Sequence, residues 1–421
     1  MKKLLLLIAA LVPVAVFAQQ IKDPALVEEF RENPYRVCVN MYPYEYSPGP
    51  QTPAPKGFKP FYISHYGRHG ARTNWAGDYQ AILDRYAAAH QAGLLTEDGE
   101  KAYEIIAELI RLHDGMDGRL TPLGQREHAQ IAERMYRNYP EVFKKGSKKI
   151  FAVSSVVPRC IISMNASTGK LLSLQGDLDI LWDTGATFQK YVSSEHTRFM
   201  RDSMRVITKD YRSRHIPDTA AFLKRIFTDP ERGRLLTGSA LSLERETFNM
   251  ACGCPALELG DHLFTLFTED DLYWYGQEIG VKFYLGQCNS VEFGDIRMPL
   301  AMPLAQDIIQ KADNAIATGE YCADLRYGHD YQLLAISSIF HLEGVGQRWT
   351  AREAEAWHGW KYTPFCANFQ LIFYRNKKGD VLVKPLLNER ETPIVGLEGG
   401  PYYKWEDIKD FISHLSINSL M

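Results

Sequence analysis

The sequence predicts an α/β fold, a three-layer sandwich with a mixed, mostly parallel central sheet and an inserted helical cap. Two observations predict it. Short apolar segments at residues 61–63, 149–153 and 323–327 have the character of buried strands, and helical periodicity lies between them. A long middle stretch, residues 172–309, consists of helical pieces broken by Pro and Gly and has no clean strand alternation.

The domain organisation follows from these segments and from the length. A chain of 421 residues is long enough for one large domain or two smaller ones. We assign the α/β core to residues 19–171 and 310–421 and the cap to residues 172–309. The composition, 45% apolar and 24% charged, is that of a globular protein.

The first 18 residues have the composition of an export signal. Lys2 and Lys3 precede an apolar run from Leu4 to Phe17, and Ala18 follows it. A short basic region, about 14 apolar residues and a small residue at the cut site are typical of a secretory signal peptide. The run is shorter than the roughly 20 residues that span a membrane. We therefore expect cleavage after Ala18, a periplasmic or secreted protein, and no stable membrane association.

Charge and cysteine content limit the partners. The formal charge of −3 becomes −5 without the two signal lysines, which argues against nonspecific binding of nucleic acid. Seven cysteines fit an oxidising compartment, but their pairing cannot be deduced. Cys252 and Cys254 lack the spacing of a zinc site, so a disulfide or buried thiols are favoured there over a metal.

The first half of the core predicts an arm, strands and helices in turn. Residues 19–60, rich in Pro, Tyr and Asn, are expected to form an irregular arm before the strand at 61–63. Helical periodicity covers residues 78–90 and 97–113. Thr121 and Pro122 are an N-cap and first-turn pair that begins a helix to about residue 136.

The strand signal returns near the end of the chain. A strand at 323–327 leads into residues 328–330, and an apolar helix follows at 331–342. Residues 369–375 and 381–387 alternate as a hairpin. Because the carboxyl ends of parallel strands meet at one sheet edge, the loops after the strands are expected to lie together.

The segment after the first strand carries the densest chemistry. Arg68 and Arg72 flank His69, and Gly67 and Gly70 let the backbone turn tightly. Guanidinium groups suit the oxygens of a phosphoryl group, and an imidazole between them can attack phosphorus. A polar surface loop is the plain alternative.

Two more strand ends supply what phosphoryl chemistry needs. Arg159 follows the strand at 149–153 and adds a third cation, whereas His329 and Asp330 follow the strand at 323–327. His69 or His329 can serve as the nucleophile. Asp330 can protonate the departing alkoxide, although an Asp at this position is also a common helix N-cap.

A basic run lies within the cap. Between residues 196 and 225 there are eight Lys or Arg residues against three Asp. Such a helical face can attract a polyanionic substrate, and it also resembles an ordinary solvated face.

Four motifs, at residues 68–72, 121–124, 154–160 and 328–330, resemble the histidine acid phosphatases, the larger branch of the histidine phosphatase superfamily, which includes phytases and multiple inositol polyphosphate phosphatases. The resemblance implies that His69 becomes phosphohistidine and that Asp330 donates the proton. It implies further that the phosphoryl oxygens are held by Arg68, Arg72, Arg159 and His329. It implies an α/β domain with a helical cap, a small-molecule phosphomonoester substrate, and no metal or organic cofactor.

Two positions depart from the family pattern. Asn74 stands where the first motif commonly has Pro. The multiple inositol polyphosphate phosphatases usually have His-Ala-Glu where this chain has His-Asp-Tyr at 329–331, although residues 367–389 are similar to that subgroup. The subgroup therefore stays open.

Other readings of the motifs are weaker. A cysteine-dependent phosphatase needs Arg six residues after its Cys, and Ala166 is at that distance from Cys160. A P-loop ending at Lys170 would need Gly where Met164 stands. A mutase of the same superfamily would not need a signal peptide. An exported phosphate- or inositol-phosphate-binding protein remains an alternative, but binding alone gives no reason for Asp330 beside His329.

Overall fold

The computed structural model describes residues 22–74, 79–193 and 196–418, with side chains as far as Ser413. The expected signal peptide lies outside the described residues. Within them, no helix is both long enough and apolar enough to cross a bilayer.

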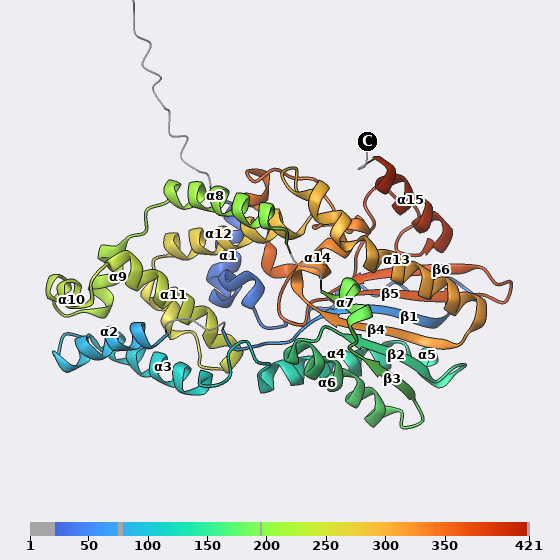
Figure 1. Cartoon of the computed structure of the whole chain (residues 1–421), viewed down its shortest axis with the longest axis horizontal. Helices are drawn as coiled ribbons and strands as arrows, with labels where there is room; N and C mark the ends of the chain where they lie inside the picture. Colours follow the sequence, from blue (N-terminus) through green and yellow to red (C-terminus); the bar gives the residue numbers. More distant parts are fainter. Residues whose placement is uncertain (1–21, 75–78, 194–195, 419–421) are drawn as a thin grey trace, which may run out of the picture.

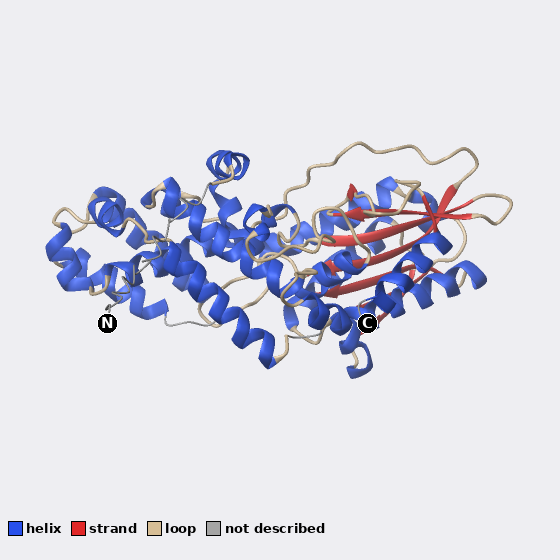
Figure 2. Cartoon of the chain, turned by 90° about the horizontal axis from the view of Figure 1, so that it is seen from above, coloured by secondary structure: helices blue, strands red, loops and turns tan. Residues whose placement is uncertain are grey.

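One mixed sheet forms the centre of the α/β part, which confirms the predicted fold class (Figures 1 and 2). Its order among the described strands is β3-β2-β4-β1-β5-β6-β7, with β8 paired to β6. The first four strands of this order are parallel, and the others are antiparallel to their neighbours. The strands are β1 (Lys59–Arg68), β2 (Lys149–Ser154), β3 (Asp179–Asp183), β4 (Tyr321–Gly328), β5 (Asn368–Arg375), β6 (Val381–Leu387), β7 (Arg390–Glu391) and β8 (Tyr403–Lys404).

The helices surround this sheet and extend well to one side of it (Figure 1). The helices, with 3₁₀ turns marked η, are α1 (Pro24–Glu32), η1 (Pro34–Met41), α2 (Tyr79–Gln91), α3 (Glu97–His113), α4 (Pro122–Asn138), α5 (Pro140–Lys144), α6 (Pro158–Leu174), α7 (Ala186–Val192), α8 (Arg198–Arg214), α9 (Thr219–Ile226), α10 (Pro230–Thr237), α11 (Ala240–Leu257), η2 (His262–Leu266), α12 (Glu269–Gln287), α13 (Gly294–Thr318), α14 (Asp330–Ile339), η3 (Glu353–Ala356), η4 (Gly359–Lys361) and α15 (Trp405–Asn418).

Alternation along the strands gives the sheet two buried faces. Ile63 of β1 packs with α4 and α6 on one face, in a cluster that includes Ala132 and Met164. The adjacent Tyr62 faces the other side, where α13, α14 and α15 cover the sheet. Three layers result, as predicted from the sequence.

Eight other helices, α1–α3 and α8–α12, form a helical lobe beside the sheet (Figure 2). Ile82 of α2 and Ile106 of α3 share a buried cluster with Phe222 of α9 and Phe248 of α11. From their place in the sequence, α2 and α3 are expected to belong to the core. Their apolar faces instead pack against the inserted segment, a long-range pairing that periodicity does not reveal.

Several local expectations were wrong. β3 lies inside residues 172–309, where no strand was expected, because its five residues are too few to show alternation. β1 runs from Lys59 to Arg68, so it is longer than the strand predicted at 61–63 and includes the first residue of the arginine-histidine loop. Arg159 lies in the first turn of α6 rather than in a loop. Asp330 begins α14 instead of capping it, with His329 at the N-cap.

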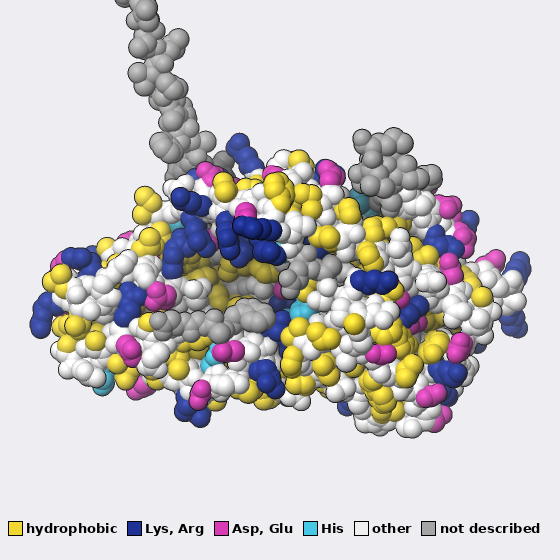
Figure 3. Space-filling view, viewed as in Figure 1, with side chains coloured by type: hydrophobic (Ala, Val, Ile, Leu, Met, Phe, Trp, Pro, Cys, Tyr) yellow, Lys and Arg dark blue, Asp and Glu magenta, His cyan; other side chains and the backbone are white. Residues whose placement is uncertain are grey.

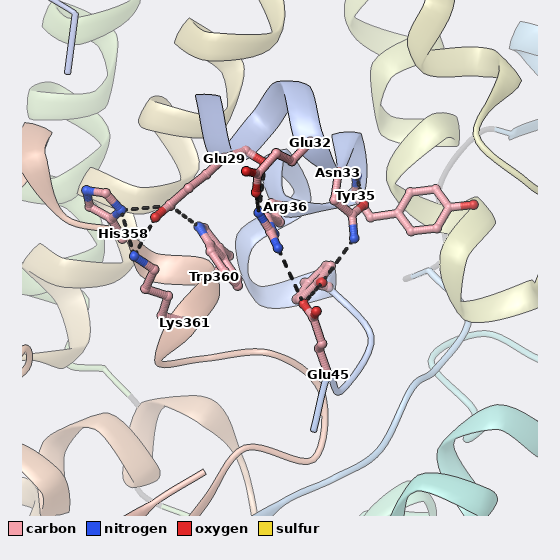
Figure 4. Close-up of polar contacts among 10 residues, drawn as sticks. Glu29, Glu32, Asn33, Tyr35, Arg36, Glu45, His358, Trp360 and Lys361 are labelled. Atoms are coloured by element: carbon pink, nitrogen blue, oxygen red, sulfur yellow. Dashed lines mark hydrogen bonds and ion pairs between the residues drawn. The ribbon is translucent and has the colours of Figure 1, made fainter. Parts of the chain in front are cut away.

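The N-terminal arm is more ordered than predicted, since it contains α1 and η1. Asp23 caps α1 by accepting a hydrogen bond from the backbone N–H of Ala25, at 2.9 Å. Figure 4 shows how the arm is held: Glu29 accepts hydrogen bonds from Trp360 Nε1 at 2.8 Å and Lys361 Nζ at 2.5 Å. Arg36 lies 4.2 Å from the centre of the Trp360 ring. These contacts fix the chain that continues towards the sheet edge.

The cysteines are all unpaired thiols in buried positions. Cys252 and Cys254 lie in α11, in the core of the helical lobe. Burial raises the pKa of the Cys254 thiol to about 12. Of the alternatives weighed for this pair, buried thiols are what the structure contains.

The parallel strands place the expected functional segments at one edge. In the β1–β4 pair, Arg68 is opposite Gly328, and in the β2–β4 pair Ser154 is opposite Tyr327. All three strands therefore end at the same level. The residues that follow them meet at this edge, as expected for parallel strands.

Close packing of α4 against the segment after β1 predicts a large effect at Gly124. A Cβ there would lie 2.6 Å from Ala71 N and would also overlap Ala71 O. We expect Gly124→Ala to lower the free energy of unfolding by about 1–3 kcal/mol in urea denaturation. Gly169→Ala is the control, because a Cβ on this exposed face of α6 meets nothing within 4 Å; it should raise the stability by up to about 1 kcal/mol. Equal effects of the two substitutions would contradict this packing.

Candidate active site

The predicted site residues converge at the edge formed by β1, β2 and β4. His69 and His329 have ring centres 5.7 Å apart, although 260 positions separate them in the chain. Arg68 Nη2 lies 2.9 Å from Asp330 Oδ2, and Arg159 Nη2 lies 3.4 Å from His329 Nδ1. Arg72 is close enough to act on the charges of both His69 and Asp330.

His69 is held as a neutral imidazole with one defined tautomer. Its Nδ1 lies 2.9 Å from the carbonyl oxygen of Gly70. Because a carbonyl only accepts, Nδ1 carries the proton and Nε2 keeps its lone pair. Burial lowers the pKa of His69 well below its usual value, and the charges of Arg68, Arg159 and Arg72 lower it further. The ring therefore presents an unprotonated nitrogen even in acid.

Three arginines concentrate positive charge around this ring. Arg68 is fully buried, and Arg72 and Arg159 are almost so. Arg68 Nη1 donates to the carbonyl oxygens of Asn40, at 2.5 Å, and Thr363, at 2.8 Å, which fixes its direction. Burial and the neighbouring guanidinium groups lower the pKa of Arg72 to about 9. Like charges held this close make a site for an anion.

Asp330 is the carboxylate of the site. Its Oδ2 pairs with Arg68, and its Oδ1 accepts a hydrogen bond from the N–H of Tyr331 at 2.8 Å. Burial alone would raise the pKa of this carboxyl, but Arg68, His329 and Arg72 outweigh burial and lower it. Its position in the first turn of α14 also favours the charged form. Without an anion in the site, Asp330 is ionised.

His329 uses both ring nitrogens within the protein. A guanidinium only donates, so Nδ1 accepts from Arg159, and Nε2–H donates to Ser155 Oγ at 3.2 Å. Burial and then the charge of Arg159 lower the pKa of His329 to about 3. The ring thus contacts Arg159 directly, whereas its expected contact with phosphoryl oxygens stays a prediction.

Asn74, which the motif pattern left unexplained, joins the site to the helical lobe. Its Nδ2 donates to the carbonyl oxygen of Asn249 in α11 at 3.1 Å. The backbone carbonyl oxygen of Asn74 accepts hydrogen bonds from Gly118 N and His113 Nε2, both at 2.8 Å. A proline has no side-chain amide to make the first of these contacts. The asparagine therefore connects the segment after Arg72 to helix α11 of the helical lobe.

One cavity reaches the site, and a second cavity lies next to the first. The first, of about 820 Å³, extends from Arg72 and Asn74 along α11 and α12. The other, of about 520 Å³, begins at His196, whose ring lies 6.3 Å from that of Tyr331, next to Asp330. The two share part of one wall, formed by Arg212, Lys282 and Phe283. Figure 3 shows Lys and Arg side chains gathered beside a hollow below α8.

Four of the eight basic residues predicted from the sequence line this second cavity. Its lining includes five cations, Arg201, Arg205, Lys209, Arg212 and Lys282, and no acidic residue. Arg212 pairs with Glu278 outside that lining, at 2.5 Å, and Arg205 lies 3.4 Å from Asp202. In the described part of the chain, Lys209 and Lys282 have no ion-pair partner. The face is therefore a cationic wall of a cavity as well as a solvated surface.

Sequence reasoning missed two residues at the site. Tyr66 donates its hydroxyl to the carbonyl oxygen of Val192, at 3.0 Å, and accepts from the N–H of His329, also at 3.0 Å. Glu127 of α4 accepts a hydrogen bond from the N–H of Ala71. The sequence pattern predicts Tyr66 as an ordinary strand residue and Glu127 as an exposed helix residue. A single sequence therefore does not indicate that either belongs to the site.

No family model and no curated protein matches the chain. Its fold does match solved structures. The Bifidobacterium longum multiple inositol polyphosphate phosphatase in complex with phosphate has a TM-score of 0.68 at 18% identity, over 90% of this chain and 97% of that one. The phytase from D. castellii has a TM-score of 0.66 at 14% identity, over 94% and 88%. The apo form of Hafnia alvei phytase has a TM-score of 0.52 at 12% identity, over 86% and 98%.

These likenesses identify the fold of the chain as the one shared by multiple inositol polyphosphate phosphatases and phytases. The resemblance drawn from four short motifs is thereby confirmed at the level of the fold.

Four buried histidines predict acid sensitivity of the fold. Burial lowers the pKa of His65, His128 and His329 to about 3, and lowers that of His69 as well. In the unfolded chain a histidine titrates near 6.5. Between about pH 6.5 and 3 the unfolded chain therefore binds more protons, so the free energy of unfolding should be highest above pH 6.5 and fall on acidification.

The expected size is about 1.4 kcal/mol per pH unit for each such histidine. Urea denaturation at pH 7.5 and pH 4.5 measures it. His128→Gln should lose less stability over this interval than the wild type. An unchanged loss in His128→Gln would show that His128 is not a neutral buried group.

Proposed function

We propose that the protein is an exported phosphomonoester hydrolase that works through a phosphohistidine on His69. The observation that carries the proposal is the environment of this ring: a neutral imidazole with its lone pair on Nε2, surrounded by three arginines, with a carboxylate paired to one of them. Export rests on the predicted signal peptide.

In the first step, the His69 Nε2 lone pair forms a bond to phosphorus. The bond between phosphorus and the ester oxygen breaks, and its electron pair goes to that oxygen, which takes a proton from Asp330. Arg68, Arg72 and Arg159 stabilise the charge on the non-bridging oxygens. Because they are already buried and oriented, little reorganisation is needed during the reaction.

In the second step, a water oxygen attacks phosphorus as Asp330, now a carboxylate, removes a proton from the water. The phosphorus–nitrogen bond breaks and returns the electron pair to His69. Inorganic phosphate then leaves, and the imidazole is again neutral.

The proton on Asp330 has to come with substrate binding, since the carboxyl is ionised in the empty site. A phosphate dianion among the three arginines offsets the charges that lower the pKa of Asp330. Its own negative charge raises that pKa further. Substrate binding and protonation of the donor are thus coupled.

The cavities support a polyphosphorylated substrate such as an inositol phosphate. The leaving oxygen faces Asp330, so the alcohol part of the substrate lies on the side where the second cavity begins at His196. Exposed cations on that cavity can bind further phosphates. The solved relatives of this fold include a multiple inositol polyphosphate phosphatase with phosphate bound and phytases.

A phosphate-binding protein without catalysis is the second candidate, since three arginines alone bind an anion. Asp330 argues against it. A carboxylate inside an anion site weakens binding by repulsion, and it is useful only if it moves a proton. We also propose that the reaction needs no metal ion, because the nucleophile and the charge stabilisation are both supplied by side chains.

Asp330→Asn tests the chemistry by separating substrates according to their leaving group. On glucose 6-phosphate, whose alkoxide needs a proton, the rate should fall about 10²- to 10⁴-fold. On p-nitrophenyl phosphate, whose phenolate leaves unaided, the loss should be much smaller.

Release of phosphate and of nitrophenol measures the two rates. His69→Ala should hydrolyse neither substrate while keeping the near-UV circular dichroism of the wild type. Equal losses on both substrates in Asp330→Asn would contradict the donor role, and near wild-type activity in His69→Ala would contradict the proposed function.

Charge reversal in the second cavity tests the substrate class. Arg205→Glu combined with Lys209→Glu should lower kcat/KM for inositol hexakisphosphate by about tenfold or more, because two attractive charges become repulsive. Hydrolysis of p-nitrophenyl phosphate, which has one phosphate, should change less than twofold.

Arg198→Glu is the matched control, because this side chain of the same helix is 91% exposed and does not line the cavity. It should leave both substrates unaffected. Parallel losses on the two substrates in the double variant would exclude the cavity as the site for the additional phosphates.

A further inference from the structure

One buried acid near the site is not used by the chemistry above. Glu127 is 4% exposed and lies on the buried face of α4, which also carries Ile131 and Ala132. An isolated carboxylate in such a place would cost several kcal/mol. Its partners therefore indicate what it is for.

Those partners come from three segments that are distant in sequence. Oε1 accepts a hydrogen bond from the N–H of Tyr44, at 2.7 Å, in the N-terminal arm. Oε2 accepts from the N–H of Ala71, at 3.0 Å, two residues after His69. The Sγ–H of Cys366, in the segment before β5, also donates to Oε2, at 3.4 Å. One carboxylate thus connects the N-terminal arm, the segment that carries His69, and the residues that precede β5.

The backbone N–H groups of the three residues before Ala71 also donate hydrogen bonds. Arg68 N donates to Ala367 O at 2.8 Å, and His69 N donates to Gly328 O at 2.9 Å. Gly70 N donates to Ser163 Oγ at 3.1 Å. These acceptors are neutral, whereas the acceptor for Ala71 N is a carboxylate. Hydrogen bonds to a charged acceptor are roughly twice as strong as neutral ones.

The N-cap residue of α4 binds the carbonyl group of Ala71 as well. The carbonyl oxygen of Ala71 accepts from Thr121 N at 2.9 Å and from Thr121 Oγ1 at 3.1 Å. Cys366, the third partner of Glu127, donates its N–H to the carbonyl oxygen of His69 at 3.0 Å. Ala71 lies between His69 and Arg72, so its anchoring sets how these two side chains are presented.

The charge of Glu127 acts on the site too. It is among the groups that raise the pKa of Arg68, against the larger effect of burial. Burial raises the pKa of Glu127, and the N–H groups of Tyr44 and Ala71 and then the Cys366 thiol oppose this. At Arg68 the negative charge of Glu127 thus opposes the effect of the neighbouring Arg159.

We propose that Glu127 is a positioning residue that fixes the segment carrying His69 and Arg72 by binding the N–H of Ala71 and tying it to the N-terminal arm. Its effect on turnover rests on the proposed function, whereas its anchoring of the segment does not. It touches neither substrate nor the reacting atoms.

Glu127→Gln tests this role with little change in shape. The amide keeps one acceptor oxygen, but its NH₂ group faces one of the two backbone N–H donors, and the charge is lost. We expect kcat on p-nitrophenyl phosphate to fall about tenfold to a hundredfold, since small misplacement of a nucleophile is costly. KM should change less than threefold, because Arg68 and Arg159 keep their own contacts.

Amide hydrogen exchange gives a readout that needs no activity. Peptides covering residues 66–73 should exchange faster in Glu127→Gln than in the wild type. The control is Glu133→Gln on the outer side of the same helix, where the carboxylate pairs with Lys170 at 3.0 Å. This control should match the wild type in kcat and in exchange of residues 66–73.

The outcomes separate the two claims. Wild-type kcat and wild-type exchange in Glu127→Gln would overturn the positioning role. A lower Tm with an unchanged kcat for the folded enzyme would also overturn it, because Glu127 would then serve stability alone. A wild-type protein that hydrolyses no phosphomonoester would refute the proposed function, and faster exchange of residues 66–73 would still establish the anchoring.

Discussion

The structure depends on the concentration of buried positive charge around one neutral imidazole. Arg68, Arg72 and Arg159 repel one another and lower the pKa of His69, so the ring keeps its lone pair in acid. Hydrogen bonds and ion pairs stabilise such a cluster. Arg68 donates to two backbone carbonyl groups and pairs with Asp330. In the proposed function a phosphoryl group relieves this repulsion, and the charge that binds it also keeps His69 unprotonated.

The residues that stabilise this charge cluster come from distant parts of the chain. Parallel pairing of β1 with β4 places His69 beside His329, and β2 leads to Arg159. The N-terminal arm supplies the Asn40 carbonyl group that orients Arg68, and the arm is itself fixed at Glu29. The helical lobe adds the cationic wall of the second cavity and contacts the segment after Arg72 through Asn74. The site is therefore a property of the whole arrangement.

Much of this was predictable from the sequence, and the failures have physical causes. α3 has the predicted ends because Thr96 caps it and its apolar face repeats regularly. The six residues predicted for the site lie at or just after the ends of buried strands, and the structure brings them together, whereas their roles stay predictions. The packing of α2 and α3 against the inserted helices was missed, since amphipathic periodicity shows that a face is buried but not its partner. Glu127 and the role of Asn74 were missed because long-range hydrogen bonds leave no local pattern.

The central claim is that His69 carries the phosphoryl group during turnover. Mixing the enzyme with ³²P-labelled substrate and quenching in alkali within milliseconds tests it directly, because a phosphohistidine survives alkali and is lost in acid. We expect labelled protein whose label maps to the peptide containing His69, with no label in His69→Ala. Label on another residue, or phosphate release by wild-type enzyme without any labelled protein in rapid quench, would contradict the account.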